Sequence, residues 1–236
     1  MSKKRAQKKE NTISFNNMVQ EKRRGPELIP KSLNQETYIV GLLDNKTDIV
    51  IAYGPAGCGK TYLAMQAAIK AFKQGQCERI VLTRPAVGVD DEQHGFLPGT
   101  LEEKMAPWTR PLFDVLREYY SAPEITNMLE EQVVEVAPLA YMRGRTFKNA
   151  WIIGDEMQNA TPSQMKMLLT RIGEGSKIVV TGDVEQADRR AKQNGLLDLC
   201  TRLQTQTEGI TVCKLSSKDI QRHRIIDTVL DIYEED

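Results

Sequence analysis

The chain has 236 residues, a length that suits one α/β domain or at most two small ones. Its 32 basic and 32 acidic residues balance, so the total charge does not require a nucleic acid or a membrane as partner. No apolar run approaches the roughly 20 residues that span a bilayer, and the charged start lacks the apolar stretch of a signal peptide. The four cysteines follow no zinc or redox spacing. We therefore expect a reduced, cytoplasmic protein without a membrane segment.

Positive charge is concentrated at the start of the chain. Residues 1–27 are polar, rich in lysine and arginine, and show little hydrophobic periodicity. We interpret them as a basic, flexible arm surrounded by solvent, and contact with a nucleic acid is the alternative.

From residue 28 to residue 236, apolar stretches predict a single domain of alternating strands and helices. Helices are expected at 29–43, 62–72, 162–172, 195–203 and 219–233, and strands at 49–53, 79–83, 133–136, 150–153, 177–181 and 210–215. Continuous apolar strands that alternate with helices favour an α/β fold, a parallel sheet with helices on both faces. An insertion around 84–132, rich in proline and glycine, interrupts this pattern. We expect it to be irregular, with one helical piece at 112–119, and to be functional or mobile.

The most informative motif follows the strand at 49–53. It reads Gly54-Pro55-Ala56-Gly57-Cys58-Gly59-Lys60-Thr61, and a helix is expected from Tyr62. This is the phosphate-binding loop pattern in its strand–loop–helix context. Backbone amides of the loop and the helix dipole favour phosphate, so we expect these eight residues and Tyr62 to bind a nucleotide. Lys60 would neutralise the β- and γ-phosphates, and the Thr61 hydroxyl would bind Mg²⁺; the alternative is a glycine-rich turn.

A second polar site follows the strand at 150–153. Asp155 and Glu156 come where this strand ends, the position at which open α/β sheets bind ligands. We expect Asp155 to hold Mg²⁺ through a water molecule, and Glu156 to accept a proton from the attacking water or to orient it. A solvated turn is the alternative.

The strand at 177–181 also ends in polar residues. Gln186 is the best candidate there for sensing the γ-phosphate, with Thr181 and Asp183 as neighbours. A plain strand-to-turn junction is the alternative.

Together these motifs resemble the PhoH family of ATPases. Further matching stretches are Thr83-Arg-Pro-Ala-Val87, Gly95-Phe-Leu-Pro-Gly99, Tyr141-Met-Arg-Gly-Arg-Thr-Phe147, Asp155-Glu-Met-Gln-Asn159 and Gln164-Met-Lys-Met-Leu-Leu-Thr-Arg-Ile-Gly173. The family is similar to the first motor domain of superfamily-one helicases. The resemblance implies a RecA-like P-loop NTPase with ATP and Mg²⁺ as cofactors, and a link to RNA. It also implies that the strand at 177–181 lies between the other two motif strands.

The resemblance assigns further roles residue by residue. Gln35 would read the adenine edge, with a surface position on a helix as the alternative. Arg84 falls where the helicases touch the nucleic-acid backbone. Arg222, in Asp219-Ile-Gln-Arg-His223, would reach a γ-phosphate. The chain departs from the family pattern at Cys58 (usually threonine), Met157 (usually alanine), Gly154 (commonly apolar) and after Gln186.

Helicases of this class need two motor domains, because the second supplies an arginine to the transition state. The chain is long enough for one, so we expect a homo-oligomeric ring, perhaps a hexamer, with ATP at subunit boundaries. Candidate arginines are Arg143, Arg145, Arg189, Arg190 and Arg222, and Arg143 and Arg145 are also candidate nucleic-acid contacts. The leading hypothesis is an ATPase that binds or remodels RNA or single-stranded DNA. A small-molecule kinase and a nucleotide-dependent scaffold are the alternatives.

Overall fold

The structure is a computed structural model. It describes residues 25–85, 101–185, 194–203, 207–221 and 225, with the backbone alone for 101–109. The sequence prediction of a basic arm falls almost wholly outside this part of the chain.

Six parallel strands form one sheet. They are β1 (Ile49–Tyr53), β2 (Arg79–Arg84), β3 (Val134–Pro138), β4 (Ala150–Gly154), β5 (Lys177–Gly182) and β6 (Ile210–Lys214), in the order β3-β2-β4-β5-β1-β6. The central strands are buried along most of their length, for example β4 throughout, which is why their sequences are continuously apolar. Strand β5 lies between β4 and β1, as the resemblance implied.

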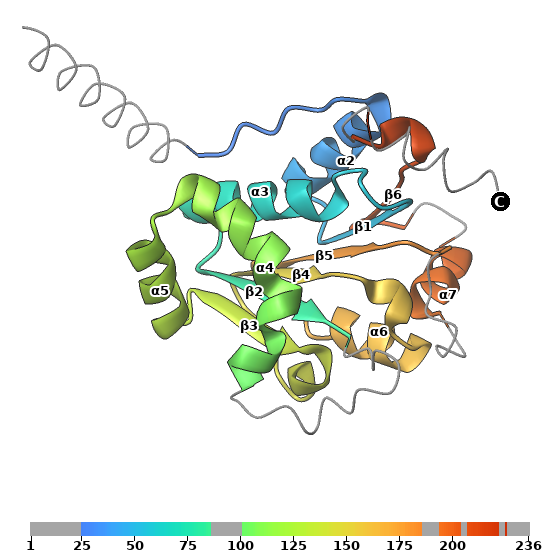
Figure 1. Ribbon diagram of the computed structural model, residues 1–236. Coiled ribbons are helices and arrows are strands. Elements are labelled where there is room, and N and C mark those ends of the chain that lie inside the picture. Colours follow the sequence, from blue (N-terminus) through green and yellow to red (C-terminus); the bar gives the residue numbers. More distant parts are fainter. Residues whose placement is uncertain (1–24, 86–100, 186–193, 204–206, 222–224, 226–236) are drawn as a thin grey trace, which may run out of the picture.

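Helices cover both faces of the sheet (Figure 1). The helices α2 (Leu33–Leu43), α3 (Lys60–Lys73), α4 (Leu101–Tyr119) and α5 (Ala122–Glu130) pack with Val50, Leu82 and Ile153 in one apolar cluster. The helices α6 (Pro162–Leu169) and α7 (Gly195–Arg202) pack with Ile51, Val81 and Ile152 in another. Alternate residues of each strand therefore face opposite layers. The prediction of a RecA-like α/β fold with helices on both faces is confirmed.

Three sequence predictions of secondary structure are corrected. Of the segment around 84–132, the described residues from 101 onward are largely helical: α4 begins at Leu101 and α5 follows it. The prolines at 107 and 111 suggested a break, yet both lie within α4. The first helix begins at Leu33 rather than at 29, after the N-cap Ser32. Residues 217–219 form a short 3₁₀ turn and not the start of a long helix; most of the expected last helix lies outside the described residues.

In the part of the chain that the structure describes, no helix is both long and apolar enough to cross a membrane. The four cysteines all lie in this part of the chain, and none of them forms a disulfide bond.

Candidate functional site

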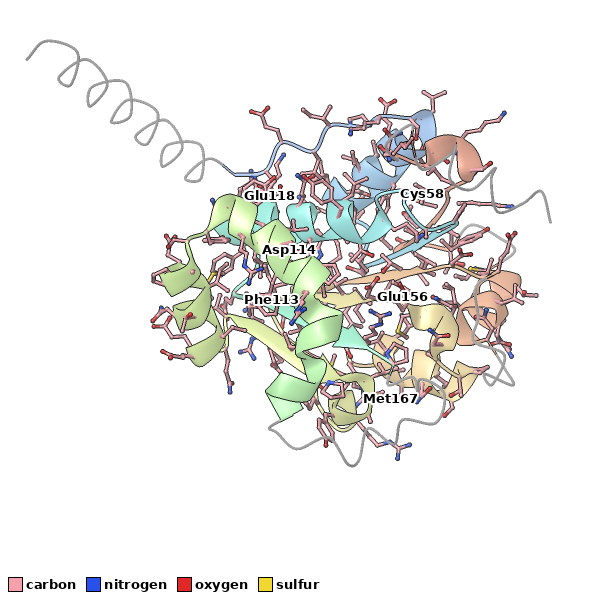
Figure 2. All side chains as sticks on the ribbon, viewed as in Figure 1. Cys58, Phe113, Asp114, Glu118, Glu156 and Met167 are labelled. Atoms are coloured by element: carbon pink, nitrogen blue, oxygen red, sulfur yellow. The ribbon has the colours of Figure 1, made fainter. Side chains whose placement is uncertain are left out.

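The motif residues meet at one end of the sheet. Because β4, β5 and β1 are adjacent and parallel, their carboxyl ends lie side by side. A cavity of about 370 Å³ lies there, between the loop at 54–61 and the residues that follow β4 and β5. Figure 2 labels Cys58 in this loop and Glu156 after β4. The structure thus brings together Lys60, Thr61, Asp155 and Glu156, which all line this one cavity.

Glycine is required in the loop for two physical reasons. Gly54, Gly57 and Gly59 have φ angles of 147°, 83° and 78°, which favour glycine. A Cβ on Gly54 would also lie 2.3 Å from the backbone oxygen of Leu215. Gly59 is the N-cap of α3 and has no side chain to cap the helix. The amino-terminal end of α3 therefore presents amide groups and a positive dipole to the cavity, which suits a phosphate.

The Lys60 ammonium group points back over the loop. Its Nζ donates to the carbonyl oxygens of Gly54 at 2.6 Å and Pro55 at 2.7 Å. Burial lowers the pKa of Lys60, and the nearby Asp183, Glu156 and Asp155 carboxylates oppose that shift. A phosphate oxygen would be a stronger partner for this cation than a neutral carbonyl.

Asp155 is held by two hydroxyl groups. Its Oδ1 accepts hydrogen bonds from Thr61 Oγ1 at 2.8 Å and from Thr181 Oγ1 at 2.6 Å. Carboxylate and hydroxyl oxygens are hard ligands of the kind that Mg²⁺ prefers, and Mg²⁺ in nucleotide sites needs only one or two protein ligands beside phosphates and waters. The residues present therefore fit Mg²⁺ bound together with a nucleotide. The sequence predicted Thr181 only as a neighbour of the γ-phosphate sensor, not as a partner of Asp155.

Glu156 has an unusual backbone and two side-chain partners. Its φ and ψ are 52° and 39°, a left-handed conformation that is rare for a non-glycine residue and is found at functional sites. Its Oε2 accepts from Gln158 Nε2 at 2.5 Å, and its Oε1 lies 3.7 Å from Arg84 Nη2. Gln158 is a residue that the sequence reasoning did not select, although the resemblance includes its position.

Helix α2 supports the phosphate loop from the side. Gln35 is 3% exposed, and its Nε2 donates to the Cys58 carbonyl at 3.1 Å while its Oε1 accepts from the Lys31 amide. The Tyr38 hydroxyl donates to the Lys60 carbonyl at 3.0 Å. The alternative that placed Gln35 on the surface is therefore wrong, while its reading of adenine stays a prediction.

The segment after β6 forms hydrogen bonds with the phosphate loop. The Gln221 amide donates to the Gly57 carbonyl at 3.0 Å, and Cys58 Sγ to the Ser216 carbonyl at 3.3 Å. Asp219, which is 2% exposed, accepts through Oδ2 from Asn34 Nδ2 at 2.8 Å and from the Ser216 amide at 2.6 Å. Burial raises the pKa of Asp219, but these hydrogen bonds outweigh it and hold the pKa at about 2. Asp219 therefore joins α2 to the segment behind the loop.

Helix α4 forms a wall of the cavity that the sequence did not predict. Pro111 and Val115 line the cavity opposite the loop. The Tyr62 hydroxyl donates to Glu118 Oε2 on α4 at 3.0 Å and fixes α4 against the start of α3. Tyr62 also lines the cavity, at the site where the sequence predicted it. Its contact with Glu118 was not predicted.

The predicted arginines fall into different settings. Arg84 lies at the site through its contact with Glu156. Arg143 is exposed. Arg145 forms a two-point ion pair with Glu135 and lies over the Phe147 ring, so its charge already has an intramolecular partner. Gln186, Arg189, Arg190 and Arg222 lie outside the described residues, and their roles stay predictions.

A larger cavity of about 570 Å³ lies at the opposite ends of the strands, near Ile49, Ala150 and Lys177. It has no phosphate loop and none of the predicted site residues. The smaller cavity is therefore the better candidate for nucleotide chemistry.

Curated proteins resemble most of the chain. It is 48% identical over 211 residues to a PhoH-like protein of Mycobacterium tuberculosis, covering 89% of this chain and 59% of that protein. It is 44% identical to a PhoH-like protein of Synechocystis, covering 90% and 64%, and 40% identical to Protein PhoH of Escherichia coli, covering 78% and 52%. The chain thus spans less than two thirds of the length of these relatives.

Among solved structures, a Sulfolobus solfataricus SWI2/SNF2 ATPase core in complex with double-stranded DNA matches with a TM-score of 0.45 at 11% identity, covering 84% of this chain and 49% of that one. The Candida albicans Pif1 helicase matches with a TM-score of 0.39 at 16% identity, covering 86% and 44%. Both likenesses are distant.

The family model described as "PhoH-like protein" matches residues 27–234, which include every strand of the sheet and every motif around the cavity. With relatives at 40–48% identity over most of its length, this chain belongs to the PhoH-like protein family.

Proposed function

We propose that this chain is a Mg²⁺-dependent ATPase. The observation that carries the proposal is the contact between Thr61, in the phosphate loop, and Asp155, after β4, at 2.8 Å. This contact joins the phosphate-binding and metal-binding parts of one site, with Lys60 and Glu156 lining the same cavity. An enzyme that transfers the γ-phosphate to water needs these parts together.

The proposed roles follow from where each group lies. Amides of the loop and of the first turn of α3 bind the phosphates, and Lys60 leaves its carbonyl partners to neutralise the β- and γ-phosphates. Thr61 and Asp155 hold Mg²⁺, which when bound neutralises developing charge on the phosphate oxygens. Asp155 can do so because Thr61 and Thr181 fix one carboxylate oxygen.

Glu156 takes the proton. A water molecule attacks the γ-phosphorus as Glu156 accepts one of its protons, and the bond from the γ-phosphorus to the bridging oxygen breaks. That oxygen leaves on ADP with the bonding electron pair, and phosphate is the other product. A carboxylate next to the metal ligand favours an activated water over a second substrate as acceptor, which argues against the small-molecule kinase.

We also propose two kinds of partner in the cytoplasm, a nucleic acid and further copies of this chain. Arg84 borders the site and its side chain is 29% exposed, which supports binding of RNA or single-stranded DNA phosphates near the cavity. A ring of this chain, perhaps a hexamer, would supply an arginine in trans; among the candidates within the described residues, Arg143 is exposed while Arg145 is held by Glu135. Light scattering with and without ATP tests the ring, and full activity as a monomer would contradict it.

The experiment that tests the enzyme is ATP hydrolysis measured with and without Mg²⁺, and with poly-RNA, single-stranded DNA or no polymer. Lys60→Ala is expected to lose nucleotide binding, and Glu156→Gln to lose hydrolysis. Mg·ATP binding without turnover in the wild type would instead favour the scaffold. A phosphorylated small molecule as product would favour the kinase.

A further inference from the structure

Both carboxylate oxygens of Glu156 are engaged by protein groups. Gln158 Nε2 donates to Oε2 at 2.5 Å, and Arg84 Nη2 faces Oε1 at 3.7 Å. A general base must have an oxygen within hydrogen-bond reach of the proton that it accepts. As it stands, this carboxylate is turned toward these two neighbours and not toward a water molecule at the γ-phosphate.

Gln158 is the fixed partner of the two. It is 2% exposed, and its Oε1 accepts from the Asp183 amide at 3.1 Å. Its amide can lie there because Gly182 has no side chain; a Cβ on Gly182 would be 2.6 Å from Gln158 Oε1. Gln158 therefore anchors Glu156 to the end of β5 and holds its left-handed backbone in place.

Arg84 is the movable partner. Its side chain is 29% exposed and that of Glu156 is 39% exposed, and 3.7 Å is an ion-pair distance rather than a hydrogen bond. Ion pairs between such partly exposed side chains are weak. A phosphate oxygen that forms charge-assisted hydrogen bonds with a guanidinium group competes well with so weak a contact.

The end of β2 is coupled directly to the catalytic residues. The Asp155 amide donates to the Thr83 carbonyl at 2.9 Å, so the residue before Arg84 is bonded to the residue before Glu156. The buried Thr83 hydroxyl has no hydrogen-bond partner among the side chains that the structure describes. A shift of the backbone at Arg84 would therefore reach Asp155, the residue next to Glu156, through this hydrogen bond.

We propose that Arg84 restrains Glu156, and that a backbone phosphate of single-stranded nucleic acid releases this restraint by drawing Arg84 away. The restraint rests on the proposed ATPase function and adds its regulation: hydrolysis is slow without polymer and faster with it. Arg84 and Gln158 are positioning residues that act through Glu156. Release frees Oε1 to accept the proton of water, while Gln158 keeps the carboxylate at the site.

The test uses the full chain and measures kcat and KM for ATP with and without polyuridylate or oligothymidylate. Arg84→Ala is expected to raise kcat without polymer by about two- to fivefold, the equivalent of up to about 1 kcal/mol, with KM unchanged. Polymer should then add no further stimulation. Arg84→Lys, which keeps the charge, is expected to restore the low basal rate.

Two comparisons separate restraint from a general effect on structure. Arg202→Ala removes an exposed arginine that pairs with Asp198 on α7, far in the sequence from the site, and should leave both rates unchanged. In a Glu156→Gln background, Arg84→Ala should no longer change kcat, because the group through which it acts is gone. Thermal melting of each variant shows whether it is folded.

Failure of the restraint and failure of the proposed ATPase function give different results. A basal kcat in Arg84→Ala that is equal to or below the wild-type value, or polymer stimulation that persists in it, overturns the restraint while leaving the ATPase intact. A wild-type protein that binds no Mg·ATP overturns the proposed function and the restraint together.

Discussion

The Cβ that Gly154 lacks would lie 3.3 Å from both Cγ and Sδ of Met157. Both positions depart from the family pattern, with glycine where an apolar residue is common and methionine where alanine is usual. Met157 occupies part of the space that a side chain at position 154 would need, together with Leu168, whose Cδ2 would lie 2.8 Å from that Cβ. Met157 is fully buried and follows Asp155 and Glu156 directly in the chain, so its contact with Gly154 lies next to the candidate site.

This relationship predicts a non-additive pair of substitutions. Gly154→Ala should cost about 1–3 kcal/mol of unfolding free energy, because the core is overpacked against Met157 and Leu168. Met157→Ala should cost about 2–5 kcal/mol through a cavity. The double variant should be more stable than the sum predicts, measured by urea unfolding. Strict additivity would show that the two residues are not coupled.

Thr181→Val is expected to weaken Mg²⁺-dependent nucleotide binding without unfolding the protein. Valine is similar in shape but removes the hydroxyl that donates to Asp155 Oδ1 at 2.6 Å. The loss of one hydrogen bond to a charged group is worth about 1.5–3 kcal/mol, so the Mg²⁺ concentration for half-maximal activity should rise at least several-fold. Thr181→Ser, which keeps the hydroxyl, is the matched control. An unchanged Mg²⁺ titration for Thr181→Val would contradict the role of Thr181.

The low pKa of Asp219 predicts that the free energy of unfolding depends on pH. Its pKa is lowered from 3.8 to about 2 by hydrogen bonds from Asn34, Ser32 and Ser216. A carboxyl whose folded pKa is depressed stabilises the fold above its unfolded pKa, and this contribution is lost as pH falls through the folded value. Asp219 should therefore contribute roughly 2 kcal/mol above pH 4 and progressively less between pH 4 and pH 2.

The check is urea unfolding of Asp219→Asn and wild type at pH 7, 4.5 and 3. The variant should be less stable at pH 7, and the difference should narrow at pH 3. Its ATP affinity should also fall, because Asp219 joins α2 to the segment that bonds to the loop. Asp114→Asn, at an exposed carboxylate on α4, is the control and should show neither effect. A pH-independent difference would contradict the assigned hydrogen bonds.

Tyr62→Phe tests whether α4 is held over the site. It removes the hydroxyl that donates to Glu118 Oε2 at 3.0 Å and accepts from Gln66 Nε2. The ring that lines the cavity remains, so ATP affinity should fall only a few-fold, by about 1 kcal/mol, through a less fixed wall. Amide hydrogen exchange should rise in α4 and not in α6. Unchanged exchange in α4 would show that other contacts position this helix.

The sequence predicted the strands well because the central ones are buried on both faces and so read as largely apolar runs. β1 was placed without error at Ile49–Tyr53, and the others within two residues at either end. The loop and the Asp155–Glu156 pair were found for a related reason: polar residues directly after apolar strands mark the functional edge of a parallel sheet.

What the sequence could not show depends on contacts between distant segments. Thr181 lies 26 residues from Asp155, and their contact exists only because β5 pairs with β4. Asn34 and Asp219 are 185 residues apart. The length of helix α4 was underestimated because proline usually ends a helix, whereas two prolines lie inside this one. The burial of Gln35 had no local signal, since glutamine is most often exposed.

One measurement tests the central claim most directly: binding and turnover of Mg·ATP by the wild type beside Glu156→Gln and Lys60→Ala. The account predicts that the wild type hydrolyses ATP, that Glu156→Gln binds Mg·ATP but hydrolyses it at least about a hundredfold more slowly, and that Lys60→Ala binds poorly. Turnover in Glu156→Gln at the wild-type rate, or nucleotide binding that is indifferent to Lys60, would contradict it.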